Sequence, residues 1–103
     1  MGKNIKISIP HELSPAEVKQ RLVEALADAR AKHPDLLRDA HETWSNDNEM
    51  HFTGHAMGQR ITGSVEIKPG QVHATIILPL LLAMFAAKLK PRIEAEGQKL
   101  FEG

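Results

Sequence analysis

The sequence contains no cysteine among its 103 residues. Disulfides, thiolate catalysis and cysteine-ligated zinc sites are therefore excluded, and the absence agrees with a reducing cytoplasm. An excess of charge of one sign is also missing, because 13 basic side chains balance 13 acidic ones. A protein held to nucleic acid by phosphate contacts needs a basic surplus, so we expect no nucleic-acid partner.

The chain also lacks a hydrophobic run long enough for a membrane helix. The most apolar stretch, residues 74–87, carries no charge but contains Pro79. It falls short of the roughly 20 apolar residues that span a bilayer, so we predict no membrane span. The opening MGKNIKISIP has no apolar signal-peptide core. We therefore expect a cytoplasmic protein.

What is present predicts a single domain over residues 1–103, which begins with a strand and a helix. Apolar residues alternate near the start and predict a strand at residues 3–9. Ser14 is a suitable N-cap, with Glu17 three residues later as in a capping box. The helix that follows is expected to stop at Pro34.

From residue 38 the apolar period changes to two, which predicts a one-sided antiparallel meander. The expected strands are 38–45, 49–57, 60–68 and 71–78. The turns between them are assigned to the segment SNDN, to Gly58-Gln59 and to Pro69-Gly70. With these turns, Gly54 and Gly63 would face one another across a hairpin and favour a strongly curved sheet.

A last helix is predicted from Pro79, with Pro91 expected to kink or break it near residues 87–90 and Gly97 expected to fray it. One stripe of its apolar residues should close the core: Leu82, Phe85, Ala86, Leu89 and Ile93. The elements together give an α+β fold, strand–helix–four-stranded meander–helix, in which one sheet packs against two helices.

Four further apolar residues of this helix exceed what one buried stripe needs: Leu80, Leu81, Met84 and Ala87. Deeper burial is one explanation, and contact with a partner, including a second copy of the chain, is the other. We predict them as the partner-binding residues.

Polar residues of the meander suggest a metal site. If both Gly58-Gln59 and Pro69-Gly70 are two-residue turns, then His51, Glu66 and His73 form one row across three strands. Two imidazoles and a carboxylate could bind zinc and leave a position for water. The alternative is a solvated face with ordinary cross-strand hydrogen bonds. His11 and His33 carry no signal.

Catalytic motifs are missing. Ser14 is explained by capping, and neither Ser45 nor Ser64 lies in a nucleophile motif. The glycines at 54, 58 and 63 do not precede a helix, so they do not form a phosphate-binding loop. We expect a protein that is not an enzyme and needs no cofactor.

In several segments the chain resembles the polyhydroxyalkanoic acid system protein family. The resemblance rests on IPHELSPAEVKQRL after the first strand, on the single Trp44, on MHFTGHAMGQRITGSVEI in the meander and on LPLLLAMFAAKLKPRIEAEG at the end. It implies a bacterial cytoplasmic protein associated with polyhydroxyalkanoate synthesis or storage granules. The family brings no defined catalytic residues.

The sequence is therefore compatible with three functions. The first is an accessory protein of polyhydroxyalkanoate metabolism that contacts the granule surface or granule proteins through Leu80, Leu81, Met84 and Ala87. The second is a module that binds a small apolar ligand between the sheet and the last helix. The third is a metal protein built on the histidine row.

Overall fold

The computed structural model describes residues 3–32, 34, 39–56 and 58–102. The elements occur in the predicted order, and the α+β prediction is confirmed. They are β1 (Lys3–Pro10), α1 (Pro15–Lys32), β2 (His41–Asn46), β3 (Glu49–Ala56), β4 (Gln59–Lys68), β5 (Gln71–Leu78), the 3-10 helix η1 (Leu80–Phe85) and α2 (Ala86–Leu100). Two predicted strand residues, Arg38 and Met57, and also His33, lie outside the described residues. Among the described residues, no helix is long and apolar enough to cross a membrane.

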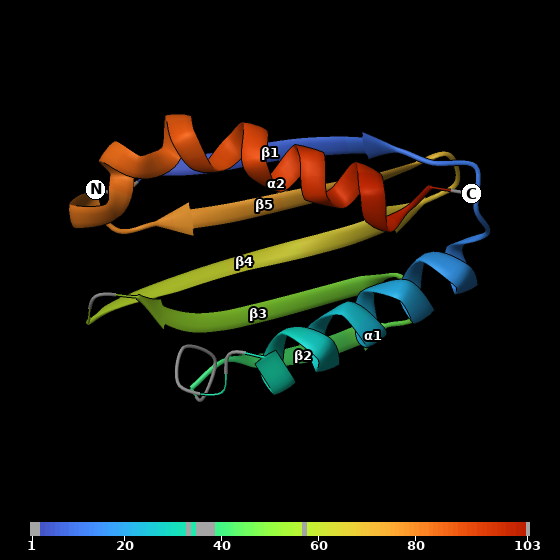
Figure 1. The fold of residues 1–103 in the computed structure, drawn as a ribbon, viewed down its shortest axis with the longest axis horizontal. Coiled ribbons are helices and arrows are strands. Elements are labelled where there is room, and N and C mark those ends of the chain that lie inside the picture. The colour runs from blue at the N-terminus through green and yellow to red at the C-terminus, as the bar shows by residue number, and fades with distance from the viewer. Residues whose placement is uncertain (1–2, 33, 35–38, 57, 103) are drawn as a thin grey trace.

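All five strands form one antiparallel sheet in the order β1-β5-β4-β3-β2. The first strand thus pairs with the last one rather than with its neighbour in sequence. Both helices lie over the same face of the sheet, α2 over β1 and β5 and α1 toward β2 (Figure 1). We call this the inner face, and the opposite one the outer face.

The inner face carries the apolar half of each alternating strand. One cross-strand row runs from Ile7 through Ala74 and Val65 to Met50. The helices add Val18, which has no exposed surface, and Leu82. Burial of an aliphatic side chain of this size contributes about 1.5–3 kcal/mol, so this single layer supplies most of the driving force for folding.

Helix α1 begins as its sequence predicts. The Ser14 hydroxyl accepts a hydrogen bond from the Glu17 amide at 3.2 Å, which satisfies one of the free amides of the first turn. Near its end, Arg30 donates to both carboxylate oxygens of Glu42 and to the Ala40 carbonyl. This two-pronged contact ties the helix to β2 at the far edge of the sheet.

Helix α2 is not broken at Pro91, where a kink or a break was expected. It continues through Pro91 and Gly97 to Leu100, so the break and the fraying at Gly97 do not occur. Gly97 packs on the Ile9 side chain, and a Cβ at this position would collide with it. Beyond the helix, Phe101 is buried, and Arg21 donates to the carbonyls of Leu100 and Glu102. Packing and this C-terminal capping offset the hydrogen bond that the proline removes.

The sequence carries no functional signal at His11, yet the side chain is buried, with 8% of its surface exposed. Its Nδ1 accepts from the Leu13 amide at 3.1 Å, and its Nε2 lies 3.0 Å from the Lys68 carbonyl. The first bond requires Nδ1 to be unprotonated, so Nε2 carries the hydrogen and donates. His11 therefore joins the β1–α1 connection to the end of β4.

We expect Gly63→Ala to destabilise the fold by about 1–3 kcal/mol, the range for overpacking. A Cβ at Gly63 would collide with the Phe52 ring and with the Thr75 carbonyl oxygen. Gly54→Ala is the matched control, because the nearest atom to its added Cβ is the Ala40 Cβ at 3.9 Å. Urea unfolding of both variants measures the difference, and equal stability would contradict this packing.

We also expect the Arg30–Glu42 pair to make stability depend on pH. The hydrogen bond from Arg30 lowers the pKa of Glu42 from its usual value of 4.5. The stabilisation is thus fully present above about pH 4.5 and is lost as the pH falls through the lower pKa of the folded state. Glu42→Gln should remove this part of the acid sensitivity in urea unfolding series, whereas an unchanged pH profile would contradict the prediction. Arg30→Lys keeps the positive charge but cannot donate to both carboxylate oxygens of Glu42 in the same way, so it should reduce the pH dependence of stability.

Candidate functional site

The four apolar residues predicted to contact a partner all lie on the surface. Leu80, Leu81 and Met84 are 72%, 68% and 77% exposed, and Ala87 is exposed as well. We call these four residues the apolar face. Deeper burial, the alternative explanation of the sequence, does not occur for any of them.

The 3-10 conformation of η1 explains this separation from the core. Pro79 is extended, and its carbonyl accepts from the Leu82 amide at 2.9 Å, which starts the helix. Side chains three apart eclipse in a 3-10 helix, so Leu81 and Met84 share one side while Leu82 lies on another. Leu82 is 5% exposed and anchors η1. Phe85 was expected in the core, but it is exposed, with 37% of its surface accessible, so this expectation was wrong.

A surface hollow adjoins the apolar face. It measures about 370 Å³ and is lined by Lys3, Asn4, Ile5, Lys6, Ala86, Ala87 and Lys90. It therefore lies between the first half of β1 and the start of α2. A second hollow lies elsewhere, between α1 and the β2–β3 turn. Both are open at the surface, and neither is the enclosed cavity between sheet and last helix that the small-ligand hypothesis expects.

The row of metal ligands predicted on the sheet does not form, because the β3–β4 register differs by two residues. Ala56 pairs with Gln59, so Gly58, with φ of 75°, takes the second central position of the turn rather than the first. His51 consequently faces Ser64, and Glu66 faces Glu49. The β4–β5 register is as predicted, with Glu66 opposite His73.

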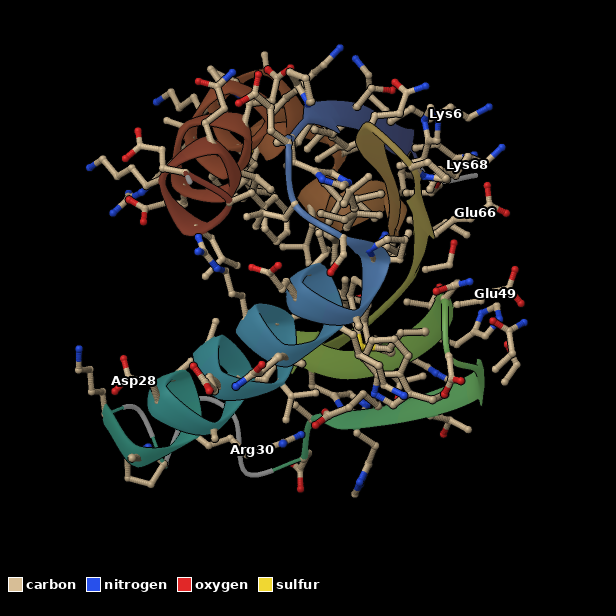
Figure 2. All side chains as sticks on the ribbon, turned by 90° about the vertical axis from the view of Figure 1, so that its right-hand side faces the viewer. Lys6, Asp28, Arg30, Glu49, Glu66 and Lys68 are labelled. Carbon is tan, nitrogen blue, oxygen red and sulfur yellow. The ribbon has the colours of Figure 1, made fainter. Side chains whose placement is uncertain are left out.

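The three residues each find a different partner on the outer face. His51 Nε2 lies 3.4 Å from Glu49, Glu66 forms an ion pair with Lys68 at 3.2 Å, and His73 contacts Ser8. Figure 2 shows Glu49, Glu66 and Lys68 projecting from the side of the sheet that faces away from the helices. The described residues include no group of three or more His, Asp or Glu side chains arranged to hold a metal ion.

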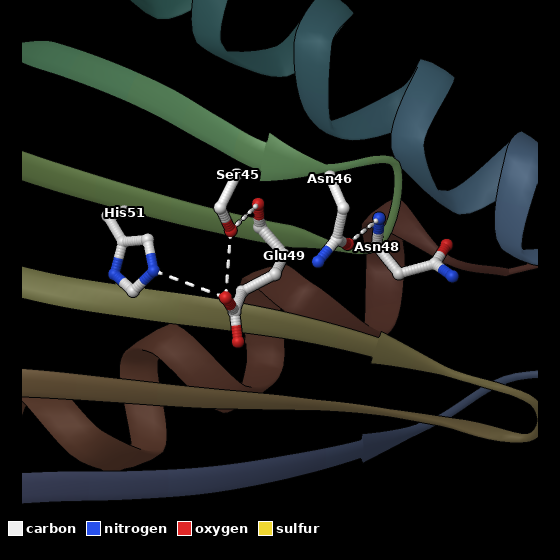
Figure 3. Close-up of polar contacts among 5 residues, drawn as sticks. All are labelled: Ser45, Asn46, Asn48, Glu49 and His51. Carbon is white, nitrogen blue, oxygen red and sulfur yellow. Dashed lines mark hydrogen bonds and ion pairs between the residues drawn. The ribbon is translucent and has the colours of Figure 1, made fainter.

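Glu49 is the centre of a polar cluster on the outer face. Ser45 donates to its carboxylate at 2.8 Å, and His51 approaches the same oxygen (Figure 3). These contacts, Ser45 first, lower the pKa of Glu49. They also relieve the repulsion that Glu49 would otherwise feel from the directly opposed Glu66.

One serine–histidine pair lies on the outer face. The Ser8 hydroxyl is 2.9 Å from His73 Nδ1, which is the spacing of a nucleophile and its base. Catalysis would also need a group that orients the histidine and donors for a developing oxyanion. Glu66 is placed opposite His73 but pairs with Lys68 instead. The pair therefore has the character of an ordinary cross-strand hydrogen bond.

The sequence matches a family model over nearly its whole length. The model is described as "Putative polyhydroxyalkanoic acid system protein (PHA_gran_rgn)", and it covers residues 5–101. The chain matches none of the curated proteins with which it was compared. Among solved structures, "Crystal structure of Ara h 8.0201" has a TM-score of 0.45 and 9% sequence identity, with 96% of each chain covered.

The polar cluster gives a direct test of the β2–β3 geometry. We expect Ser45→Ala to raise the pKa of Glu49 toward 4.5, because Ser45 supplies the largest lowering contact, and His51→Gln to raise it less. NMR titration of the Glu49 carboxyl carbon measures both changes. Thr43→Ala, which alters the residue opposite His51, serves as the control. If Ser45→Ala leaves the Glu49 pKa unchanged, the contact does not exist in solution.

Proposed function

The chain belongs to the polyhydroxyalkanoic acid system protein family, and from this premise we propose that it is a small non-enzymatic accessory protein of polyhydroxyalkanoate metabolism. It contacts the surface of the storage granule, or proteins on that surface, through the apolar face. On this proposal the protein is in the cytoplasm, at the granules.

The exposure of the apolar face is the observation that supports this proposal. Leu80, Leu81 and Met84 are each about 70% exposed or more and neighbour one another on a six-residue helix. Single exposed apolar residues are normal on a soluble protein, but clustered large ones mark interaction sites. Complete burial of a leucine or methionine gains about 1.5–3 kcal/mol, so even this small set gives measurable affinity.

The polar contacts of the sheet support a role in binding rather than in catalysis. Ser45 donates to the Glu49 carboxylate instead of to a histidine. The Ser8–His73 pair lacks an orienting carboxylate, because Glu66 pairs with Lys68 instead. The proposal therefore assigns the outer face a structural role.

Sedimentation with purified granules tests the granule contact. We expect the wild-type protein to pellet with granules and Leu81→Glu/Met84→Glu to remain in the supernatant, because buried carboxylates lose their hydration. Both changes lie outside the core, so circular dichroism and melting temperature should stay close to wild type.

The matched control is Val23→Glu/Ala27→Glu, which adds the same two charges to exposed positions of α1. This control should pellet like wild type. Wild-type protein that stays in the supernatant would contradict granule contact. Equal pelleting of wild type and Leu81→Glu/Met84→Glu would contradict the assignment to the apolar face.

A further inference from the structure

We propose that the apolar face docks on an anionic phospholipid layer, an inference that rests on the proposed function and names the chemistry of its partner. The supporting observation is a group of basic residues at the same end of the molecule, at the start of β1 and in the first turns of α2: Lys3, Lys88, Lys90 and Arg92. We call these four residues the cationic rim.

The fold assembles the cationic rim from two distant segments. Lys3 lies opposite Leu78 in the β1–β5 pairing, so β1 begins beside the end of β5 that leads into η1. Lys3 and Lys90 both line the hollow that reaches Ala87. Figure 1 shows η1 and the N-terminal end of β1 together at one end of the long axis.

Acidic and basic residues are unevenly distributed along the sequence, although their totals are equal. No Asp or Glu occurs between Ile67 and Ile93, or before Glu12. All four rim residues are exposed, and among the described residues none of them forms an ion pair. Because the acidic residues of α2 begin only at Glu94, positive charge predominates at the start of β1 and of α2.

Apolar side chains surrounded by lysine and arginine suit an anionic lipid interface. Leu80, Leu81 and Met84 can enter the boundary between headgroups and acyl chains while the rim contacts the headgroup phosphates. Lysine stems lie along apolar surface and keep the ammonium in the polar layer. Each basic residue near an anionic layer adds about 1 kcal/mol of attraction.

The same features disfavour a protein partner and a second copy. A standard protein interface uses about 20–30 residues on each side, far more than the apolar face provides. A two-fold dimer would place the face against itself, so the two cationic rims would meet. Like charges brought together in this way cost affinity.

Vesicle flotation tests the inference. The wild-type protein should float with vesicles of phosphatidylglycerol and phosphatidylcholine, bind pure phosphatidylcholine weakly, and dissociate as salt is raised. Lys88→Gln/Lys90→Gln should reduce affinity for the anionic vesicles roughly tenfold or more. Leu81→Glu/Met84→Glu should abolish binding.

The matched control is Lys68→Gln/Lys99→Gln, which removes the same charge at the opposite end of the molecule and should bind like wild type. Equal binding to anionic and neutral vesicles, or equal loss in the two lysine variants, would overturn the role of the cationic rim.

The vesicle and granule experiments distinguish the lipid inference from the proposed granule contact. Protein that pellets with granules but ignores anionic vesicles would overturn the lipid inference and leave the granule contact intact. Protein that binds vesicles but not granules would overturn the granule contact alone. A wild-type dimer that Leu81→Glu/Met84→Glu converts to a monomer, without vesicle binding, would identify the face as a self-interface and overturn the inference.

Discussion

The pairing of β1 with β5 is the constraint on which the rest of this structure depends. It joins strands separated by more than half of the chain, and eight residue pairs from Lys3–Leu78 to Pro10–Gln71 hold it. Closing so long a loop costs entropy that only packing can offset. The pairing completes the inner face. It also gives α2 a strand to pack against, where Gly97 of the helix contacts Ile9 of β1. The His11 side chain fastens its far end to the Lys68 carbonyl.

The same pairing connects the fold to the candidate site. Lys3 lies far from Leu80 and Lys90 in the sequence, and the antiparallel register brings it to the same end of the sheet. A sheet with β1 at another edge would keep the apolar face and the basic residues of α2 but would lack Lys3 beside them. The electrostatic character of this end therefore depends on local sequence in α2 and on topology for the contribution of β1.

The sequence predicts those features that local chemistry determines. Alternation identifies the strands, Ser14 identifies the start of α1, and Pro69-Gly70 gives the β4–β5 register, since Gly70 has the positive φ of 86° that such a turn needs. The β3–β4 register was missed because one glycine fits either central position of a turn, and the wrong choice moves every partner by two residues. The single slip was enough to create the predicted metal row. The continuation of α2 through Pro91 and the role of His11 depend on contacts made across the fold, which no local pattern contains.

The apolar face was predictable because too many apolar residues occupy one short segment, but its shape depends on the 3-10 geometry. At 100° per residue, Leu81 and Met84 in an α-helix would be displaced by about 60° around the axis. A 3-10 helix removes this displacement and stacks them, at the cost of poorer hydrogen-bond geometry. The row of Leu81 and Met84 can then remain exposed while the adjacent Leu82 is buried. One side of η1 thus holds the helix to the core through Leu82, and another side exposes Leu81 and Met84 to solvent. Substitutions at the exposed positions can therefore change the surface without disturbing the core.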